Sequence, residues 1–471
     1  MKKFDLNIEK VLEDWEVYHA TREIIANALD EQALTNSSEI KIFKENDKWH
    51  IRDFGRGIKY EHLTQNESDE KLKFPEKVIG KFGVGLKDAF ATFDRKNIKV
   101  LIKSKYSDIT LGKSSKKDFE DIMTLHALVS VPSNPSMNGT DFILDGIKDE
   151  DIELAKEFFL KFSNETELEK TQYGSVLKKH STGKIYINGL RVAEEENFLF
   201  SYNITSITTK IKKSLNRERT NVGRSAYTDR VKSILLECEE FKVAETLVND
   251  LEKFELGESH DELSWIDVSV HACKLLNSKD KVIFLTPYDL SENQTMVDRA
   301  KRDNIRIVTI PENVKYKIRG QEDTEGNIIR DIDEYASEWN NSFEFSFIDE
   351  KLLSNNEKEI FSKKNEIFEL IGGKPKKIKN ILISETMRLE SQGYQEAVGL
   401  WEEHEGRIII RRDQLSDLSS FAGVLLHETA HAICGYSDIT IEFENQLTSL
   451  LGIIAEKKIK KSFWRIFKND N

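Results

Sequence analysis

A helix predicted over residues 17–34 carries acidic and amide side chains beside an apolar stripe, and it limits the fold of the first 145 residues more than any other feature. Glu23, Asn27 and Asp30 are spaced i, i+4 and i+7, so they share one face of that helix. The spacing therefore predicts an amphipathic helix with a polar edge along one side of its core-facing stripe.

Three glycine-containing segments follow that helix, each near a predicted strand or helix end. After strands predicted at 39–43 and 49–53, Asp53 precedes two glycines, which permit a tight turn and close approach to a ligand. A second glycine segment opens a helix predicted at 82–93, where exposed N–H groups and the positive helix end form an anion cradle. The third segment, ending in Thr140, leads into a strand predicted at 141–144. Alone each is commonly a turn, but the four together favour a nucleotide pocket.

The four segments, over about residues 10–145, resemble the ATP-binding domain of the GHKL superfamily. This superfamily includes gyrase, the large ATP-dependent heat-shock chaperone, histidine kinases and MutL, and IGKFGVGLK (79–87) is especially similar to the MORC proteins. The resemblance implies a Bergerat-type α/β sandwich over 1–146 that binds ATP and Mg²⁺ and hydrolyses ATP. In that family the residue matching Glu23 orients and deprotonates the attacking water, and the one matching Asn27 is a Mg²⁺ ligand.

The same resemblance implies the nucleotide contacts. Asp53 would accept a hydrogen bond from the adenine amino group, and Thr140 would assist it. The stretch 59–78, polar and irregular, lies where the family has its mobile ATP lid. The remaining residues expected to bind the cofactor are Asp30 on the helix, Gly55 and Gly57 in the adenine pocket, and Gly80, Gly83, Gly85 and Lys87 in the phosphate loop.

Residues 147–240 fall where GHKL proteins have an S5-like transducer domain, which sends a basic side chain to the γ-phosphate. The candidates are Arg217, Arg219 and Arg224, which match by position and charge rather than by the family's lysine-loop motif. A solvated basic loop and a nucleic-acid contact remain open alternatives for this stretch. Residues 241–375 contain a βαβ pattern, with strands predicted at 281–285 and 305–310, and form an α/β middle region of unknown role. The glycines and proline at 372–375 predict a domain boundary.

The segment HETAH within a helix predicted at 421–435 carries the second chemical motif. His427 and His431 are one helical turn apart and can bind one metal, while Glu428 beside them is placed as a general base. The motif, over about residues 376–456, resembles the zincin metallopeptidases. This resemblance implies a zincin-like α+β domain at 376–471 that binds Zn²⁺ and hydrolyses peptide bonds.

Two carboxylates compete for the third zinc ligand. Glu444 is preferred, because its spacing to Leu447 and Leu451 predicts that it points along the apolar face of the helix at 440–451. Asp438 is the alternative, and it would also serve as a helix N-cap. Tyr394 and Tyr436 are candidates for oxyanion stabilisation.

Composition narrows the class of protein. The 471 residues have a net charge of −13, which disfavours general binding to nucleic acid or anionic surfaces. Three distant cysteines form no disulfide framework, and no signal peptide or membrane span is visible. These features predict a cytoplasmic, multidomain α+β protein with no membrane partner.

The two motif sets together predict a zinc metallopeptidase controlled by ATP. Mg·ATP would close the lid, promote a homodimer and gate cleavage of a protein or peptide substrate. The alternative is a chaperone- or clamp-like GHKL ATPase whose zinc site is structural or inactive. Metal coordination separates the two, because a catalytic zinc keeps an open position.

Overall fold

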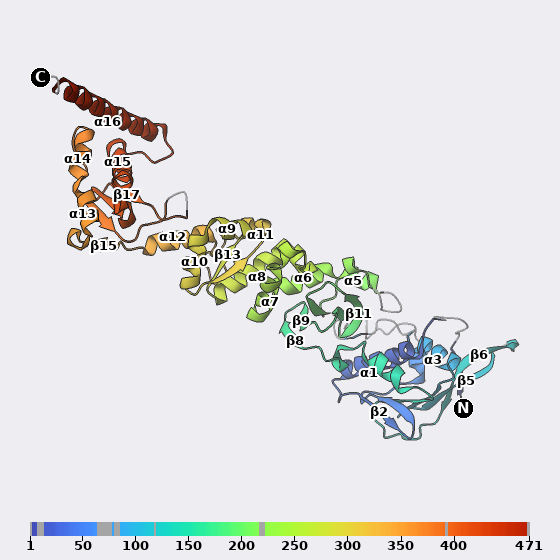
Figure 1. Ribbon diagram of the computed structural model, residues 1–471. Coiled ribbons are helices and arrows are strands. Elements are labelled where there is room, and N and C mark those ends of the chain that lie inside the picture. The colour runs from blue at the N-terminus through green and yellow to red at the C-terminus, as the bar shows by residue number, and fades with distance from the viewer. Residues whose placement is uncertain are drawn as a thin grey trace. The chain divides into compact units, whose positions relative to one another are not determined.

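The computed structural model shows a multidomain α+β protein made of two compact units, Met1–Lys279 and Asp280–Asn471 (Figure 1). The multidomain α+β class expected from the sequence is confirmed. No helix among the described residues is long and apolar enough to cross a membrane. The structure describes residues 2–6, 14–63, 78–79, 85–116, 119–215, 222–390 and 394–468.

The first unit begins with a seven-stranded sheet in which every neighbouring pair is antiparallel. Helices α1 (Val17–Thr35) and α3 (Gly85–Arg95) pack against each other and against this sheet. Their apolar stripes are fully buried, which is what stabilises the two layers. The strands, in spatial order, are β1 (Lys2–Asp5), β6 (Phe119–Ser130), β5 (Asp108–Lys116), β4 (Lys99–Ser104), β7 (Thr140–Asp145), β3 (Lys48–Arg52) and β2 (Lys41–Glu45).

The predicted helix and hairpin at the start of the chain are confirmed as α1 and the β2–β3 pair. Helix α4 (Asp149–Lys156) also joins this layer, because Ile152 and Ala155 are buried in the same core as α1. The first core thus extends past residue 146, where the sequence suggested a domain end.

The second sheet of this unit has five strands and is covered by helices that follow it in the chain. Its order is β11-β10-β12-β9-β8, and the β10–β12 pair is parallel while the others are antiparallel. Helix α6 packs on β9 and β12, and α7 and α8 pack on each other. The elements are β8 (Glu167–Lys170), β9 (Gly174–Lys178), β10 (Gly183–Ile187), β11 (Leu190–Glu195), β12 (Phe200–Ile204), α5 (Thr209–Ser214), α6 (Thr228–Leu236), α7 (Phe241–Leu251) and α8 (Ile266–Lys279).

The second unit opens with the predicted βαβ motif, in which β13 (Val282–Leu285) and β14 (Arg306–Thr309) pair in parallel. Leu389 and the partly buried Tyr394, from much later in the chain, pack into the same core. The helices of this part are α9 (Pro287–Glu292), α10 (Gln294–Arg302), α11 (Glu312–Ile318) and α12 (Ile332–Ser342).

The remaining elements form a four-stranded sheet with helices packed against one another and against it. The order is β15-β16-β18-β17, with β16 and β18 parallel and both outer pairs antiparallel. The elements are β15 (Phe347–Ile348), α13 (Asn355–Ser362), α14 (Lys364–Leu370), β16 (Asn380–Ser384), β17 (Gly399–Glu402), β18 (Arg407–Arg411), α15 (Leu418–Cys434) and α16 (Ile441–Lys468).

The boundary predicted at 372–375 therefore lies inside one core rather than between two. Helices α13 and α14 pack on α15, and β15 pairs with β16 on the other side of that boundary. The glycines there make a turn, since Gly372 and Gly373 have φ of 99° and 117°.

Candidate functional site

The polar edge of α1 is largely buried, as a ligand-binding edge requires. Glu23 and Asp30 are 3% and 1% exposed, and Asn27 between them is half-buried. The Arg22 Nη2 atom lies 3.1 Å from Glu23 Oε1, so the carboxylate is held by a buried cation. This pairing fixes the orientation of the side chain expected to act as the base.

The first helical turn of α3 lies directly against Glu23. A Cβ atom placed on Gly85 would be 2.3 Å from Glu23 Oε2, so a side chain at this position would force the Glu23 carboxylate to move. The structure thus brings the first and third sequence segments together, and the half-buried Lys87 lies in the first turn of the same helix. Gly80 and Gly83 lie outside the described residues.

Asp30 holds the chain just before the glycine segment. Its Oδ1 atom accepts a hydrogen bond of 2.5 Å from the Ile79 N–H group. The carboxylate therefore positions the backbone that leads into the expected phosphate loop. Of the stretch expected as the lid, the part from 64 to 77 also lies outside the described residues.

Asp53 lies at the end of β3 and is 4% exposed. Its Oδ1 atom accepts a hydrogen bond of 2.9 Å from the Gly55 N–H group, and its own N–H group donates to the Thr140 carbonyl at 2.9 Å. The Thr140 Oγ1 atom accepts a hydrogen bond from Ile58 N–H. Burial raises the pKa of Asp53 to about 6, although its contacts with Gly55 and Thr140 act in the opposite direction. A buried carboxylate in this environment is suited to accept a hydrogen bond from a donor such as an amino group.

Close backbone approach at this carboxylate depends on glycine. A Cβ atom on Gly139, which has φ of 75°, would lie 2.0 Å from the Asp53 carbonyl oxygen. A Cβ atom on Gly57, which has φ of 86°, would lie 3.0 Å from the Gly139 carbonyl oxygen. The second and fourth sequence segments therefore form one structure around Asp53.

Two residues that the sequence reasoning missed hold the turn after Asp53. The Glu31 carboxylate accepts hydrogen bonds from the backbone N–H and the side chain of Arg56, at 2.8 to 3.0 Å. Glu31 also contacts Gly55 closely, because a Cβ there would lie 2.5 Å from Glu31 Cγ. The sequence places Glu31 next to Asp30 on the same helix, but that position does not reveal the contact with Arg56.

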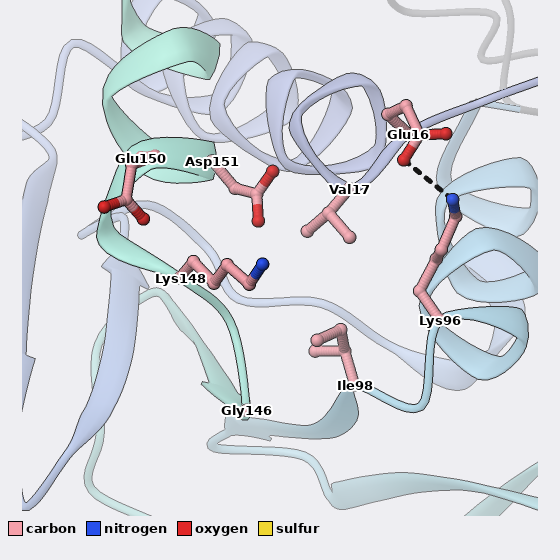
Figure 2. A pocket seen from close by; sticks show the side chains of 8 residues that line it. All are labelled: Glu16, Val17, Lys96, Ile98, Gly146, Lys148, Glu150 and Asp151. Atoms are coloured by element: carbon pink, nitrogen blue, oxygen red, sulfur yellow. Dashed lines mark hydrogen bonds and ion pairs between the residues drawn. The ribbon is translucent and has the colours of Figure 1, made fainter.

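A separate pocket of about 480 Å³ lies at the other end of this sheet and is distinct from the Asp53 region. Its lining includes the start of α1 and the turn after β7, and the Glu16–Lys96 ion pair of 2.7 Å lies along one side of it (Figure 2). Because β3 and β7 are antiparallel, Gly146 lies at the strand ends opposite to Asp53. We assign no sequence-predicted site residue to this pocket.

The transducer arginines are only partly described. Arg224 contacts Asp261 at 2.6 Å and Glu195 at 3.6 Å, so its charge is paired within its own sheet and helices. Arg217 and Arg219 lie outside the described residues.

The titration of Asp53 gives a pH prediction. If the ionised carboxylate accepts from the adenine amino group, affinity falls as pH decreases through about 6, because protonation removes that acceptor. Between pH 7.5 and pH 5 we expect the Kd for a non-hydrolysable ATP analogue to rise about 10-fold, measured by titration calorimetry. Asp53→Asn should weaken binding at pH 7.5 and flatten the profile; a wild-type profile without pH dependence would contradict this role.

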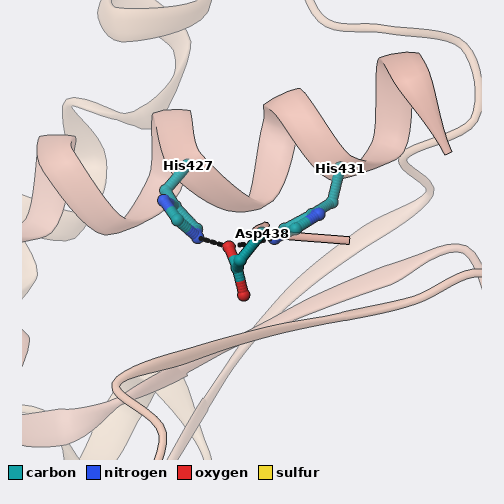
Figure 3. A group of neighbouring side chains, drawn as sticks. All are labelled: His427, His431 and Asp438. Carbon is teal, nitrogen blue, oxygen red and sulfur yellow. Dashed lines mark hydrogen bonds and ion pairs between the residues drawn. The ribbon is translucent and has the colours of Figure 1, made fainter. Parts of the chain in front are cut away.

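In the second unit, the two motif histidines and Asp438 converge below α15 (Figure 3). Asp438 Oδ1 lies 2.8 Å from His427 Nε2 and 3.1 Å from His431 Nε2. Ligand atoms around one tetrahedral zinc lie about 3.3 Å apart, and the three candidate ligand atoms here all lie within 4.8 Å of one another, so the group could close around the ion. The His431 Nδ1 atom is 2.7 Å from the Tyr436 carbonyl oxygen, a contact that orients the ring.

The helix that carries the histidines, α15, is capped at both ends. Asp417 accepts hydrogen bonds from the Ser419 and Ser420 N–H groups at the start, and Gly435 has φ of 74° at the end. The Gly435 turn then returns the chain so that Asp438 reaches the histidines. The aromatic ring of Phe443, from α16, stacks on His431 at 4.1 Å between ring centroids.

Glu428 is 5% exposed and lies against the edge strand β17. A Cβ atom on Gly399 would be 2.6 Å from Glu428 Oε1, so glycine in that strand allows the carboxylate to sit there. Burial, together with the negative charge of Asp438, raises the pKa of Glu428 to about 8. A cation held by the neighbouring His427, His431 and Asp438 would lower this pKa again and favour the carboxylate form that a proton acceptor needs.

The expectation that Glu444 points along the apolar face of its helix is wrong. Glu444 is exposed, whereas Phe443 and Leu450 are buried against Ala430 of α15. The buried face of α16 is therefore formed by Phe443 and Leu450, each one residue before the predicted Glu444 and Leu451. Asp438 rather than Glu444 lies beside the histidines.

The two tyrosines have other surroundings. The Tyr394 hydroxyl donates to Asp333 in the βαβ part, and the Tyr436 side chain is exposed.

Zinc affinity separates the two acidic candidates. Asp438→Ala should weaken zinc binding by more than about 100-fold, because it removes one of three converging ligands. Glu444→Ala is the matched control and should change affinity by less than about 2-fold. Competition with a fluorescent chelator measures both values, and the reverse order of effects would restore Glu444 as the ligand.

Comparison with known proteins finds related sequences in Mycoplasma pneumoniae. Residues 150–241, which include the five-stranded sheet, match the family described as Mycoplasma pneumoniae MPN635 N-terminal domain. One protein of that organism, described as an uncharacterized protein, is 39% identical over 240 residues, which are 50% of this chain and 97% of the relative. A second, with the same description, is 27% identical over 149 residues, or 31% of this chain and 42% of the relative.

Proposed function

This chain belongs to the family of the 39% identical Mycoplasma pneumoniae protein, whose description assigns no activity, and we propose from its geometry that it is a zinc-dependent peptidase controlled by ATP. The observation that carries the proposal is the convergence of His427, His431 and Asp438 with Glu428 adjacent on the same helix. The His427 side chain is 41% exposed and Asp438 is 59% exposed, so a peptide has access to the group. Open access favours a catalytic metal over a structural one.

The fit of the residues defines their roles. His427, His431 and Asp438 would hold zinc, which polarises a carbonyl group and lowers the pKa of water. Glu428 would accept the proton of the attacking water and return it to the leaving amine. The antiparallel edge strand β17 leaves space for this carboxylate at Gly399, where a side chain would collide with it.

At the other end of the chain, the pocket residues support ATP binding and hydrolysis. Asp53 would accept from the adenine amino group, and Asn27 would be a Mg²⁺ ligand beside Glu23. Glu23, held by Arg22, would orient and deprotonate the attacking water. Gly139 leaves no room for a side chain against the Asp53 backbone, and a side chain at Gly85 would displace the Glu23 carboxylate, which supports a built pocket rather than unrelated turns.

Coupling of the two centres is tested by comparing cleaved N-termini in cells. Wild type and Glu428→Gln are expressed, and new N-termini are identified by mass spectrometry. We expect a set present only with wild type and absent when Glu23→Gln blocks the nucleotide cycle. If cleavage requires Glu428 but is insensitive to Glu23, the peptidase stands without ATP control. A set unchanged in Glu428→Gln would overturn the peptidase. Sedimentation velocity with and without a non-hydrolysable ATP analogue tests the expected homodimer.

A further inference from the structure

Arg22 is a buried cation, and its surroundings include more than its ion pair with Glu23. It is 1% exposed, and a charge at this depth in a protein requires compensation. Glu23 supplies the opposite charge, while the ring centres of Trp15 and Phe158 lie 5.6 and 5.3 Å from the Arg22 Cζ atom. A guanidinium group within about 6 Å of an aromatic ring centre is attracted by the π electrons of the ring. The group that orients Glu23 is therefore held by two side chains that lie outside α1.

Phe158 lies where the first layer of this unit meets the second sheet. It follows α4, and its carbonyl accepts a hydrogen bond of 2.7 Å from the Arg191 N–H group of β11. The Arg191 Cζ atom lies 4.8 Å from the centre of the Phe158 ring. Leu190, the first residue of β11, is buried in the same core as α1. One ring thus contacts both the guanidinium that pairs with Glu23 and a guanidinium of the second sheet.

The turn between β10 and β11 makes a further contact near the proposed nucleotide site. The Asn188 Nδ2 atom donates a hydrogen bond of 3.0 Å to the Val78 carbonyl. The next residue, Ile79, donates from its N–H group to Asp30 of α1. Two adjacent residues are thus held from opposite partners, one by α1 and one by the second sheet. The β10–β11 hairpin therefore contacts the surroundings of this site at two separate points.

We propose that Phe158 is a positioning residue for ATP hydrolysis, acting through the Arg22–Glu23 pair. This inference rests on the ATPase activity proposed above. Glu23 must point at the attacking water to accept its proton, and the contact with Arg22 limits where the carboxylate points. The Phe158 ring holds Arg22 in place, and Arg191 ties the ring to β11. The second sheet thereby sets the rate of the hydrolytic step without sending a basic side chain to the γ-phosphate.

Phe158→Leu removes the π face and keeps an apolar side chain. We expect kcat for ATP hydrolysis to fall about 10-fold, with the Kd for a non-hydrolysable ATP analogue within about 3-fold of wild type. Phe158→Tyr keeps the ring and should retain kcat within about 2-fold of wild type. The matched control is Phe162→Leu, which alters an aromatic of the same core whose ring packs edge-on to Phe159. It should hydrolyse ATP at the wild-type rate.

The link to the second sheet is tested with Arg191→Met, which removes the guanidinium and keeps the backbone contact with Phe158. We expect kcat to fall about 5-fold, again with nucleotide affinity retained. Because both side chains act through one ring, the double variant with Phe158→Leu should be within about 2-fold of Phe158→Leu alone. Glu194→Gln alters the carboxylate that lies 2.9 Å from Arg191 and should leave kcat unchanged.

The possible results separate this inference from the proposed ATPase. If Glu23→Gln hydrolyses ATP at the wild-type rate, Glu23 is not the base, and the role of Phe158 falls with that assignment. If Glu23→Gln is inactive while Phe158→Leu keeps the wild-type kcat, only the positioning role is wrong. Equal losses in Phe158→Leu and Phe158→Tyr would also overturn it, since the ring would then contribute packing alone. Additive losses in the double variant would exclude Arg191 and the second sheet from the effect.

Discussion

Replacing Glu428 by Gln is expected to reduce proteolysis by at least about 1,000-fold while ATP turnover stays within about 2-fold of wild type. The amide keeps the shape of the side chain in its buried position against β17 but cannot accept a proton. Zinc affinity should change little, since Glu428 is not among the three converging ligands. Peptidase activity on a substrate found by N-terminal mass spectrometry, with zinc content measured on the same sample, provides the check.

The matched control is Glu442→Gln, which changes an exposed glutamate near the same site. It should retain full proteolysis. A Glu428→Gln protein that is folded, loaded with zinc and as active as wild type would remove Glu428 from the chemistry and with it the proposed peptidase.

Glu23→Gln is expected to lower ATP hydrolysis by at least about 100-fold, with nucleotide affinity retained within about 3-fold. Glu23 contacts Arg22 and the start of α3, whereas Asp53 contacts Gly55 and Thr140, so the substitution should remove the base and spare the adenine contact. Steady-state phosphate release and binding of a labelled ATP analogue separate the two effects.

An exposed glutamate of α4, Glu153, supplies the comparison through Glu153→Gln, which should hydrolyse ATP at the wild-type rate. Equal losses of binding and hydrolysis in Glu23→Gln would instead indicate that Glu23 supports the pocket structurally. Undiminished hydrolysis would exclude it as the base.

Local patterns predicted the helices that carry the candidate sites well. The spacing of Glu23 and Asp30 follows from helical periodicity, and the helix of the zinc motif ends at Gly435 as a C-cap glycine indicates. Strand β5 was missed because Asp108–Lys116 is polar, and its stability comes from pairing with two neighbours rather than from apolar alternation.

Features that depend on tertiary contacts were beyond prediction from sequence. The third residue of the metal group is decided by the path of the turn after Gly435, and the buried face of α16 by the fit of Phe443 on His431. A one-residue shift of that face moved Glu444 into solvent, an outcome that periodicity alone does not resolve. The role of Glu31 likewise appears only when the turn at Arg56 is seen against α1.

The packing of α13 and α14 onto α15 determines the smallest fragment of the chain that can fold in isolation and keep the His427–His431–Asp438 group. A fragment starting at residue 376 would lack five buried side chains of that core: Leu353, Ile360, Phe361, Ile367 and Phe368. At about 2 kcal/mol each, their loss is comparable to the entire folding free energy of a domain. Truncation for crystallisation or calorimetry should therefore begin upstream of Phe347, so that β15 and both helices are retained.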